Sequence, residues 1–251
     1  MTKLTSLMEL TADQWRQALD LPESDIPDIV IVEGSWWREQ RITWRLSYLS
    51  EVRELKFPDI FWGRWQGKRV AFCCVYGAAR VVEIIHLFGI VGAKLAVQIG
   101  TCGGLQAHVK PGDIILPEVA ICREGVAHLY GAFDAVMGST AWLDRAQQLL
   151  TGRDHQVYRG THLTWVALFP QTGKMIETWS RAGYLSVDME TATTFAVAEY
   201  FQMPALSMLV VWDDLTRNRS FLDPLSKEEL AALDRANESV FEVALALTHQ
   251  L

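Results

Sequence analysis

The chain has 251 residues, half of them hydrophobic, and a formal net charge of −7 at pH 7. This length and composition suit one large or two small globular domains with a sizeable core. The negative charge argues against a nucleic-acid backbone or an anionic membrane as the main partner, because both require clustered Lys and Arg. No stretch approaches the length of a membrane span, and the first residues lack the apolar core of a signal peptide.

The four cysteines show no zinc-ligand spacing, and the six scattered histidines include no HExxH motif. Two of the cysteines, Cys73 and Cys74, are adjacent in an apolar segment. This pattern predicts buried, reduced thiols in a cytoplasmic protein and no metal site.

Predicted strands and helices alternate along the chain. Apolar runs predict strands over residues 28–32, 93–99, 113–120, 163–169 and 205–214. Helices are expected in the Trp/Arg-rich segment after residue 34 and over 11–21, 79–94, 140–151, 173–182, 190–201 and 226–247. A hairpin is expected over 57–75, with its turn at Gln66-Gly67. The alternation predicts a single α/β domain over residues 1–251, with an N-terminal helical extension over 1–27.

The segment VQIGTCGGL, residues 97–105, reads as an apolar strand that runs into a glycine-rich loop. Its glycines match neither GxGxxG nor a P-loop ending in Gly-Lys-Ser/Thr. A loop between two strands can still present backbone N–H groups to an anion. The segment therefore predicts an anion cradle that lacks a nucleotide signature.

Ligands of open α/β sheets bind beyond the carboxyl ends of the strands. The chain places a distinctive set of residues at the expected strand ends: Gly34, Arg38, Thr101, Phe169, Asp188, Met189, Glu190, Trp212, Asp213 and Asp214. The set offers backbone donors, a hydroxyl, one cation, aromatic rings and several carboxylates. It suits an uncharged polar molecule with an aromatic part, cleaved with help from an anion.

Three segments resemble motifs of the nucleoside phosphorylase family, which includes purine nucleoside phosphorylases, uridine phosphorylase and related nucleosidases. IGTCGGLQAHVKPGDIIL, starting at residue 99, resembles the family's glycine loop and the strand after it. SVDMETATTFAVA, starting at residue 186, is similar to its M-E ribose motif, and VVWDD, starting at residue 210, stands where the family has V-S-D. The resemblance spans roughly residues 28–247. It implies a three-layer sandwich in which helices flank a central, mixed, twisted β-sheet.

The resemblance also implies the site residues of N-glycosidic bond cleavage. Asp213 would donate a proton or a hydrogen bond to the departing base, with Asp214 as the competing residue. Glu190 would bind both ribose hydroxyls, with Met189 packed on the sugar. The other expected substrate-binding residues are Asp188, Trp212 and Phe169, the last by stacking on the base.

Inorganic phosphate is the co-substrate that the resemblance implies, and no cofactor is expected. The phosphate-binding residues would be Gly34, Arg38, Thr101, Gln98 and Lys56. Lys56, with Arg53 close by, lies near the position of an arginine that a neighbouring subunit supplies in the family. Gln98 stands where the family's phosphorylases have an arginine, and its amide supplies no charge. The family's hydrolases also lack this arginine, so hydrolysis by water remains open beside phosphorolysis.

The sequence thus favours a nucleoside phosphorylase that releases a free base and ribose 1-phosphate. An aspartate at position 213 favours purines, because the family's purine enzymes keep it. A nucleosidase and a non-catalytic nucleoside-binding protein on the same scaffold remain alternatives. Expected partners are the nucleoside, phosphate and further copies of the chain, as a dimer or a hexamer built from dimers. The Trp/Phe-rich hairpin at 57–75 would supply apolar surface for this association.

Overall fold

The computed structural model describes residues 6–251. Its strands are β1 (Ile29–Gly34), β2 (Ser50–Glu54), β3 (Phe61–Trp65), β4 (Lys68–Val75), β5 (Leu95–Gly104), β6 (Ile114–Arg123), β7 (Ala135–Met137), β8 (Val157–Trp165), β9 (Ser186–Asp188) and β10 (Ala205–Asp214). Its α-helices are α1 (Ala12–Leu19), α2 (Arg38–Leu46), α3 (Ala78–Val91), α4 (Thr140–Thr151), α5 (Gly173–Arg181), α6 (Thr191–Tyr200) and α7 (Lys227–Leu247). Short 3₁₀ segments are η1 (Leu7–Glu9), η2 (Glu23–Asp25), η3 (Ala127–Tyr130), η4 (Leu215–Arg217) and η5 (Thr248–Gln250).

All the described strands belong to one mixed sheet, in the order β10-β6-β8-β9-β5-β1-β4-β3-β2, with β7 beside β6. Because β5 also pairs with β10, the strands β10, β6, β8, β9 and β5 close into a ring within this sheet. β1 lies parallel to both of its neighbours, β4 and β5. The carboxyl ends of β1, β4, β5 and β10 therefore meet at one edge.

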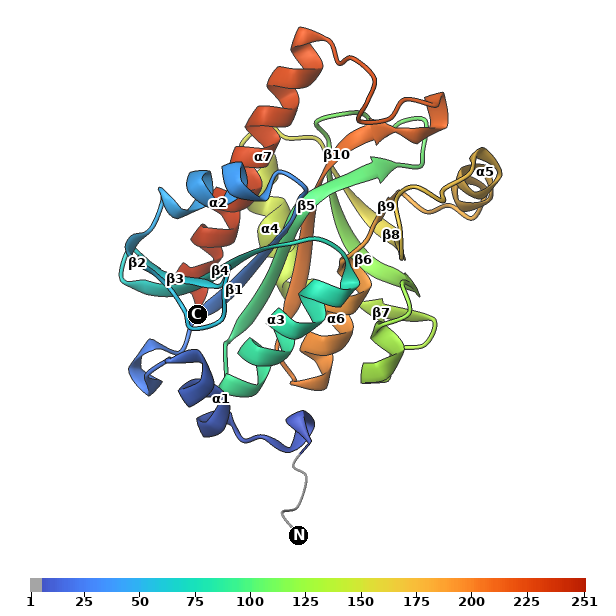
Figure 1. Ribbon diagram of the computed structural model, residues 1–251. Coiled ribbons are helices and arrows are strands. Elements are labelled where there is room, and N and C mark those ends of the chain that lie inside the picture. The colour runs from blue at the N-terminus through green and yellow to red at the C-terminus, as the bar shows by residue number, and fades with distance from the viewer. Residues whose placement is uncertain (1–5) are drawn as a thin grey trace.

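Helices cover both faces of the sheet, with α3 and α6 on one face and α2, α4 and α7 on the other (Figure 1). β1 shows how one strand serves both layers, since Val30 and Val32 join the core under α3 while Ile29 and Ile31 join the core under α7. Burial on both faces explains why the central strands are nearly continuous apolar runs. The predicted three-layer α/β sandwich is confirmed.

Short-range signals in the sequence place several boundaries correctly. Thr11 and Ser226 form the capping boxes that begin α1 and α7. Gln66 and Gly67 have φ values of 47° and 80° and form the two-residue turn of the β3–β4 hairpin. This left-handed pair is the turn that matches the twist of two antiparallel strands.

The glycine-rich segment is a strand, so the expected loop at this point is wrong. β5 continues to Gly104 and remains paired with β10, and its last two residues also pair with β9. A Cβ on Gly103 would lie 2.5 Å from Leu215 Cδ1, so glycine allows this close packing. The strand expected over 163–169 is shifted as well, because β8 ends at Trp165. β2 and β7 were not predicted.

The β3–β4 hairpin contributes its aromatic side chains to the core of its own subunit. Trp62 is buried, and its indole N–H donates to the Asp25 carbonyl at 2.7 Å. Phe61 and Trp65 pack against the core under α7. The hairpin is therefore not the free apolar surface that the sequence indicated, and the homo-oligomer stays a prediction.

The described part of the expected N-terminal extension packs against the rest of the fold. Trp15 and Leu19 of α1 belong to the same core as α3, and the Trp15 ring meets His86 edge-on at 6.3 Å. Residues 1–5 of the expected extension lie outside the described residues. Among the helices within 6–251, none combines the length and the apolar composition needed to cross a membrane.

Gly100→Ala tests the close approach of β5 to β1. The added Cβ would lie 2.9 Å from the Gly34 carbonyl oxygen, a backbone atom held by strand pairing. We expect the free energy of unfolding, measured by urea denaturation, to fall by about 1–3 kcal/mol. Gly173→Ala is the control, because its Cβ would meet no atom within 4 Å. Equal stability of Gly100→Ala and wild type would contradict the constraint.

Candidate active site

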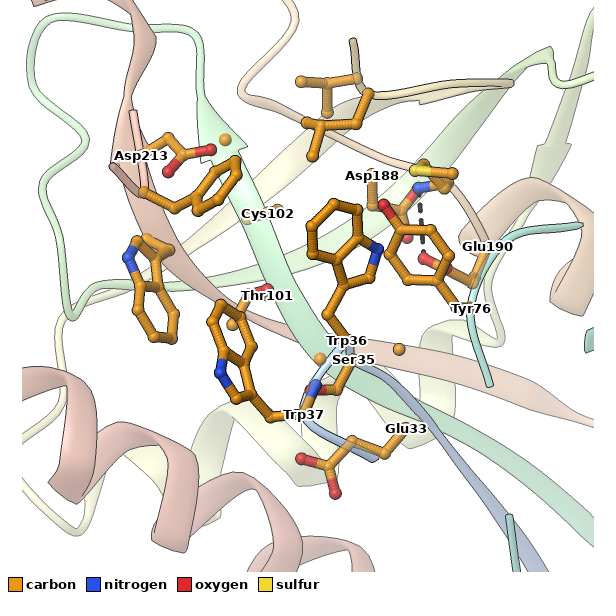
Figure 2. Close-up of a pocket in the computed structure, with 18 of the residues that line it drawn as sticks. Glu33, Ser35, Trp36, Trp37, Tyr76, Thr101, Cys102, Asp188, Glu190 and Asp213 are labelled. Atoms are coloured by element: carbon orange, nitrogen blue, oxygen red, sulfur yellow. Dashed lines mark hydrogen bonds between the residues drawn. The ribbon is translucent and has the colours of Figure 1, made fainter. Parts of the chain in front are cut away.

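A cleft opens at the sheet edge where β1, β5, β9 and β10 end (Figure 2). It encloses about 890 Å³ of space, including open solvent at its mouth. Seven of the residues predicted from the sequence line it: Gly34, Thr101, Asp188, Met189, Glu190, Trp212 and Asp213. These residues come from segments up to 180 positions apart in the chain and are brought together by the strand order.

Glu190 is a buried carboxyl at the N-cap position of α6. Its Oε1 accepts a hydrogen bond from the Gly77 N–H at 2.6 Å, and its Oε2 accepts one from the Met189 N–H at 3.2 Å. Burial, and next the negative charge of Asp188, raise the pKa of Glu190 to about 8. A Cβ on Gly34 would lie 3.0 Å from Oε2, a tight contact that would require the Glu190 carboxyl to shift. In the ionised form, each carboxyl oxygen retains capacity to accept a further hydrogen bond from a ligand.

Asp188, in contrast, has its acceptor sites filled by the protein. Its Oδ1 lies 2.8 Å from His162 Nε2 and accepts from the Thr164 hydroxyl at 3.0 Å. Its Oδ2 accepts from the Thr191 hydroxyl at 2.6 Å and from Gln98 Nε2 at 3.3 Å. Burial would raise the pKa of Asp188, yet the pKa lies below its ordinary value because His162 and these hydroxyls stabilise the carboxylate. Asp188 thus fixes the floor of the cleft.

The two acids at the end of β10 have different surroundings. Asp213 lines the cleft, and its buried Oδ1 has no hydrogen-bond partner within the described residues. Burial raises the pKa of Asp213 to about 7. Asp214 is also buried, but it accepts a hydrogen bond from the Thr216 hydroxyl at 2.9 Å and pairs with Arg217. Asp213 therefore lines the cleft with one buried oxygen unpartnered, whereas Asp214 holds the following 3₁₀ turn.

The two cations expected to bind an anion do not line the cleft. Arg38, the first residue of α2, has a half-exposed side chain whose Nη1 donates to Asp59 Oδ2 at 2.6 Å. Lys56 is exposed in the segment between β2 and β3. Within the described chain, neither residue lines the cleft beside Thr101, and an anion site that includes them stays a prediction.

Gln98 and Phe169 also lie outside the cleft lining. Gln98 is buried behind the floor, where its amide donates to Asp188 and accepts from the Thr191 hydroxyl at 2.8 Å. Phe169 lies beyond the end of β8 and is 77% exposed, with its ring centroid 5.7 Å from that of Trp36. Both were expected to contact ligands directly, and both instead contact residues that line the cleft.

Aromatic rings at the mouth of the cleft were missed by the sequence analysis. Trp36 stands next to Tyr76, with ring centroids 5.4 Å apart, and meets Phe221 at 6.0 Å (Figure 2). Trp37 stacks on Trp212 with ring planes 1° apart. Tyr76 directly follows β4, so the rule that ligands meet strand ends could have found it. Phe221 lies in a loop and has no local signal.

Arg41 is the one cation among the described residues that lines the cleft. It lies one helical turn beyond Arg38 on α2, and its Nη1 is 3.5 Å from Glu33 Oε1 at the end of β1. Burial lowers the pKa of Arg41, although the neighbouring Glu33 carboxylate acts in the opposite direction. Arg41 was not among the residues expected from the sequence.

The described residues around the cleft do not favour catalysis by a cysteine nucleophile or by a metal ion. Cys102 lines it, but burial raises the pKa of the thiol, which disfavours the nucleophilic thiolate. Within residues 6–251, no group of three His, Cys, Asp or Glu side chains is arranged to hold a metal ion. The lining instead combines a carboxyl that is readily protonated, a hydrogen-bond acceptor for hydroxyls, a threonine hydroxyl and flat aromatic faces.

Asp213→Asn tests whether Asp213 is a buried carboxyl whose ionised form is not stabilised by its surroundings. An unfolded aspartate ionises near pH 4, whereas burial holds the folded group protonated up to about pH 7. Wild-type stability therefore carries no penalty from this group below pH 4 and falls as pH rises from 4 to 7. Asparagine does not ionise, so we expect the melting temperature of Asp213→Asn to rise relative to wild type by several degrees between pH 5 and pH 8.

Asp214→Asn is the matched control for this measurement. It removes the charged partner of Arg217, so it should lower the melting temperature at both pH values. A difference between Asp213→Asn and wild type that stays constant from pH 5 to pH 8 would contradict the raised pKa.

The chain is similar to known proteins over nearly its whole length. The family model described as "Phosphorylase superfamily" matches residues 29–249. A guanosine phosphorylase of Halorubrum lacusprofundi is 26% identical over 183 residues, which cover 70% of this chain and 74% of the relative. A DeoD-type purine nucleoside phosphorylase of Caldanaerobacter subterraneus subsp. tengcongensis is 27% identical over 218 residues, covering 80% and 93%.

Solved structures share the fold at lower identity. Uridine phosphorylase from Vibrio fischeri ES114, in complex with 6-hydroxy-1-naphthoic acid, superposes with a TM-score of 0.79 at 20% identity and covers 92% of this chain and 95% of its own. A P. knowlesi homologue of P. falciparum PNP superposes with a TM-score of 0.72 at 18% identity, covering 100% and 97%.

Proposed function

We propose that this chain, which belongs to the phosphorylase superfamily, cleaves the N-glycosidic bond of a ribonucleoside with inorganic phosphate. The products would be the free base and ribose 1-phosphate. The observation that carries the proposal is the presence of Glu190 and Asp213 in one cleft, one a buried acceptor for hydroxyls and the other a carboxyl with a free oxygen and a pKa near neutrality.

The reaction separates charge, and Asp213 can neutralise the negative charge that develops on the departing base. As the bond from C1′ to the base nitrogen breaks, its electron pair moves onto the base, and the sugar becomes positive. Asp213 would donate its proton to the departing base, which avoids release of an anion. A phosphate oxygen would then form the new bond to C1′. A pKa near 7 suits this role, because the acid is still partly protonated at neutral pH.

Recognition of the sugar is assigned to Glu190 and Met189. The Glu190 carboxyl would accept hydrogen bonds from the two ribose hydroxyls, and the Met189 side chain would pack against the ring. The aromatic residues Trp36, Tyr76 and Phe221 at the cleft mouth offer flat apolar faces to a base. We propose a purine base, with support from the similarity of the chain to a guanosine phosphorylase and to a DeoD-type purine nucleoside phosphorylase.

Hydrolysis is the second candidate, and one observation favours it. None of Arg38, Lys56 and Gln98 lines the cleft, so the expected phosphate ligands are reduced to Gly34 and Thr101. A water molecule attacking C1′ requires no cation beside it. The same Glu190 and Asp213 would then serve a nucleosidase that releases free ribose.

A panel of nucleosides incubated with and without phosphate tests the proposal. We expect base release to require phosphate, ribose 1-phosphate to form in equal amount, and guanosine or inosine to react faster than uridine. Asp213→Asn should lower kcat by roughly 10²–10⁴-fold, the usual contribution of a general acid, with little change in KM.

Asp214→Asn serves as the control for the loss of a nearby acid. It should retain most of the activity at a temperature where it is folded, because Asp214 faces the 3₁₀ turn. Phosphate-independent release of free ribose would reject phosphorolysis in favour of hydrolysis. Full activity of Asp213→Asn would reject the assigned acid.

The assignment of Glu190 predicts selectivity for ribose over 2′-deoxyribose. A nucleoside without the 2′-hydroxyl loses one hydrogen bond to the buried Glu190 carboxyl, which costs about 1–3 kcal/mol. We therefore expect kcat/KM to be roughly 5–150-fold higher for a ribonucleoside than for its 2′-deoxy analogue, by the usual conversion of free energy to rate ratio. Glu190→Ala should lower activity on both and abolish the preference. Equal rates on the two wild-type substrates would contradict the role.

A further inference from the structure

Three charged side chains lie together where β1 ends and α2 begins. Glu33 is 1% exposed, and its carboxylate binds the guanidinium of Arg45 through two hydrogen bonds, Nε to Oε2 at 2.8 Å and Nη2 to Oε1 at 3.0 Å. Arg41 approaches the same carboxylate less closely, with 3.5 Å between its Nη1 and Oε1. A two-pronged contact of this kind is the strong form of an arginine–carboxylate pair.

Arg45 is enclosed in the core and has no route to a ligand. Its side chain is fully buried, with Trp44 and Phe241 ring centroids 4.0 and 4.8 Å from the guanidinium carbon. Its Nη2 also donates to the Asn237 carbonyl at 2.9 Å. A guanidinium in such a place is stable only while its carboxylate partner is present. Arg45 therefore holds Glu33 in one position at the end of β1.

The charges of this group do not cancel. Glu33 and Arg45 neutralise each other, so the positive charge of Arg41 is left over in the wall of the cleft. Its side chain is 13% exposed and lines the cleft. Asp234 of α7 is the other acid that acts on Arg41, from outside the cleft lining. A partly desolvated guanidinium with surplus charge favours an anion as its partner.

The acids across the cleft leave room for such an anion. The Asp188 carboxylate is already stabilised by hydrogen bonds with His162 and the Thr191 hydroxyl at the floor of the cleft. Burial raises the pKa values of Glu190 and Asp213 to about 8 and about 7, which lowers their negative charge near neutral pH. The cleft is therefore less repulsive to an anion than its count of carboxyls indicates.

We propose that Arg41 binds the phosphate co-substrate, and that Glu33 and Arg45 are positioning residues that hold Arg41 against the cleft. Arg41 would take the role that the resemblance implied for Arg38, Lys56 and the family arginine at the position of Gln98. Thr101 and the backbone of Gly34 line the same cleft and complete the set of donors. The inference rests on the proposed function in one respect, the use of free phosphate as the nucleophile.

Phosphate binding to the free enzyme, measured by isothermal titration calorimetry, tests Arg41 without relying on turnover. Arg41→Ala should weaken the phosphate Kd by about 10–100-fold, and Arg41→Lys by less, because a charge remains but the fork is lost. Arg38→Ala is the matched control on the same helix, paired with Asp59 outside the cleft, and should change the Kd less than about threefold. Wild-type phosphate affinity in Arg41→Ala would overturn the proposal.

Arg45→Lys tests the positioning role. It keeps the buried charge but loses the two-pronged contact with Glu33. We expect the KM for phosphate to rise several-fold while the KM for nucleoside and the kcat at saturating phosphate stay near wild type. A purely structural role would lower the melting temperature and leave the KM for phosphate unchanged. If Arg45→Lys does not fold, Glu33→Asp provides the same comparison, because it keeps the carboxylate but withdraws it from Arg41.

Two further arms separate this inference from the proposed function. If base release proves independent of phosphate while Arg41→Ala still loses phosphate affinity, the proposed function fails and the anion site stands. If turnover requires phosphate but Arg41→Ala binds it normally, the inference fails and the function stands. Nucleoside 5′-monophosphate is titrated in parallel. Arg41-dependent binding of this ligand, without Arg41-dependent binding of inorganic phosphate, would overturn the assignment to free phosphate.

Discussion

Asp188 is the buried charge on which the geometry of the cleft depends. Its carboxylate contacts His162 and Thr164 of β8, Gln98 of β5 and Thr191 at the start of α6, so one side chain ties three elements to the end of β9. A buried carboxylate is tolerated only with such a complete set of donors. The arrangement also places Glu190, two residues further on, at the N-cap of α6 and facing the cleft. The position of the ribose-binding candidate thus follows from a network that lies behind it.

Three of the four carboxyls that line the cleft, Asp188, Glu190 and Asp213, differ because their donors differ. Asp188 is held ionised by its neighbours, whereas Glu190 has two backbone donors and Asp213 has an oxygen without a partner. Burial then dominates for the latter two and raises their pKa values to about 8 and about 7. Separation of pKa values among neighbouring acids is how one site can hold both a fixed charge and a proton donor. The raised pKa of the proton donor, Asp213, lowers the free energy of unfolding increasingly as pH rises.

Local patterns in the sequence were enough to predict one α/β domain and the strand-end residues of the cleft, because burial periodicity, capping boxes and strand ends depend on neighbouring residues. The three layers were predicted from the resemblance to the nucleoside phosphorylase family. The pairing of β5 with β10 was not predictable this way, since it joins segments over 100 residues apart and turns an expected loop into a strand. Phe169 was misplaced because β8 ends four residues earlier than its apolar pattern indicated. Arg38 was preferred over Arg41 by counting positions, whereas the orientation of α2 turns Arg38 toward Asp59 and Arg41 toward the cleft.

Gln98 and Arg41 are linked through the charge balance of the cleft. Gln98 is a neutral member of the Asp188 network, and its amide both donates to Asp188 and accepts from Thr191. An arginine at position 98 would have Asp188 as its nearest carboxylate. Asp188 would then neutralise the positive charge of this arginine, and the charge would not be available to a ligand. With the neutral amide of Gln98, the Asp188 carboxylate is paired with His162 and the threonine hydroxyls, and the positive charge in the cleft lining is that of Arg41. On this view, the absence of an arginine at position 98 does not by itself remove the capacity to bind an anion, because the cation enters the cleft from α2.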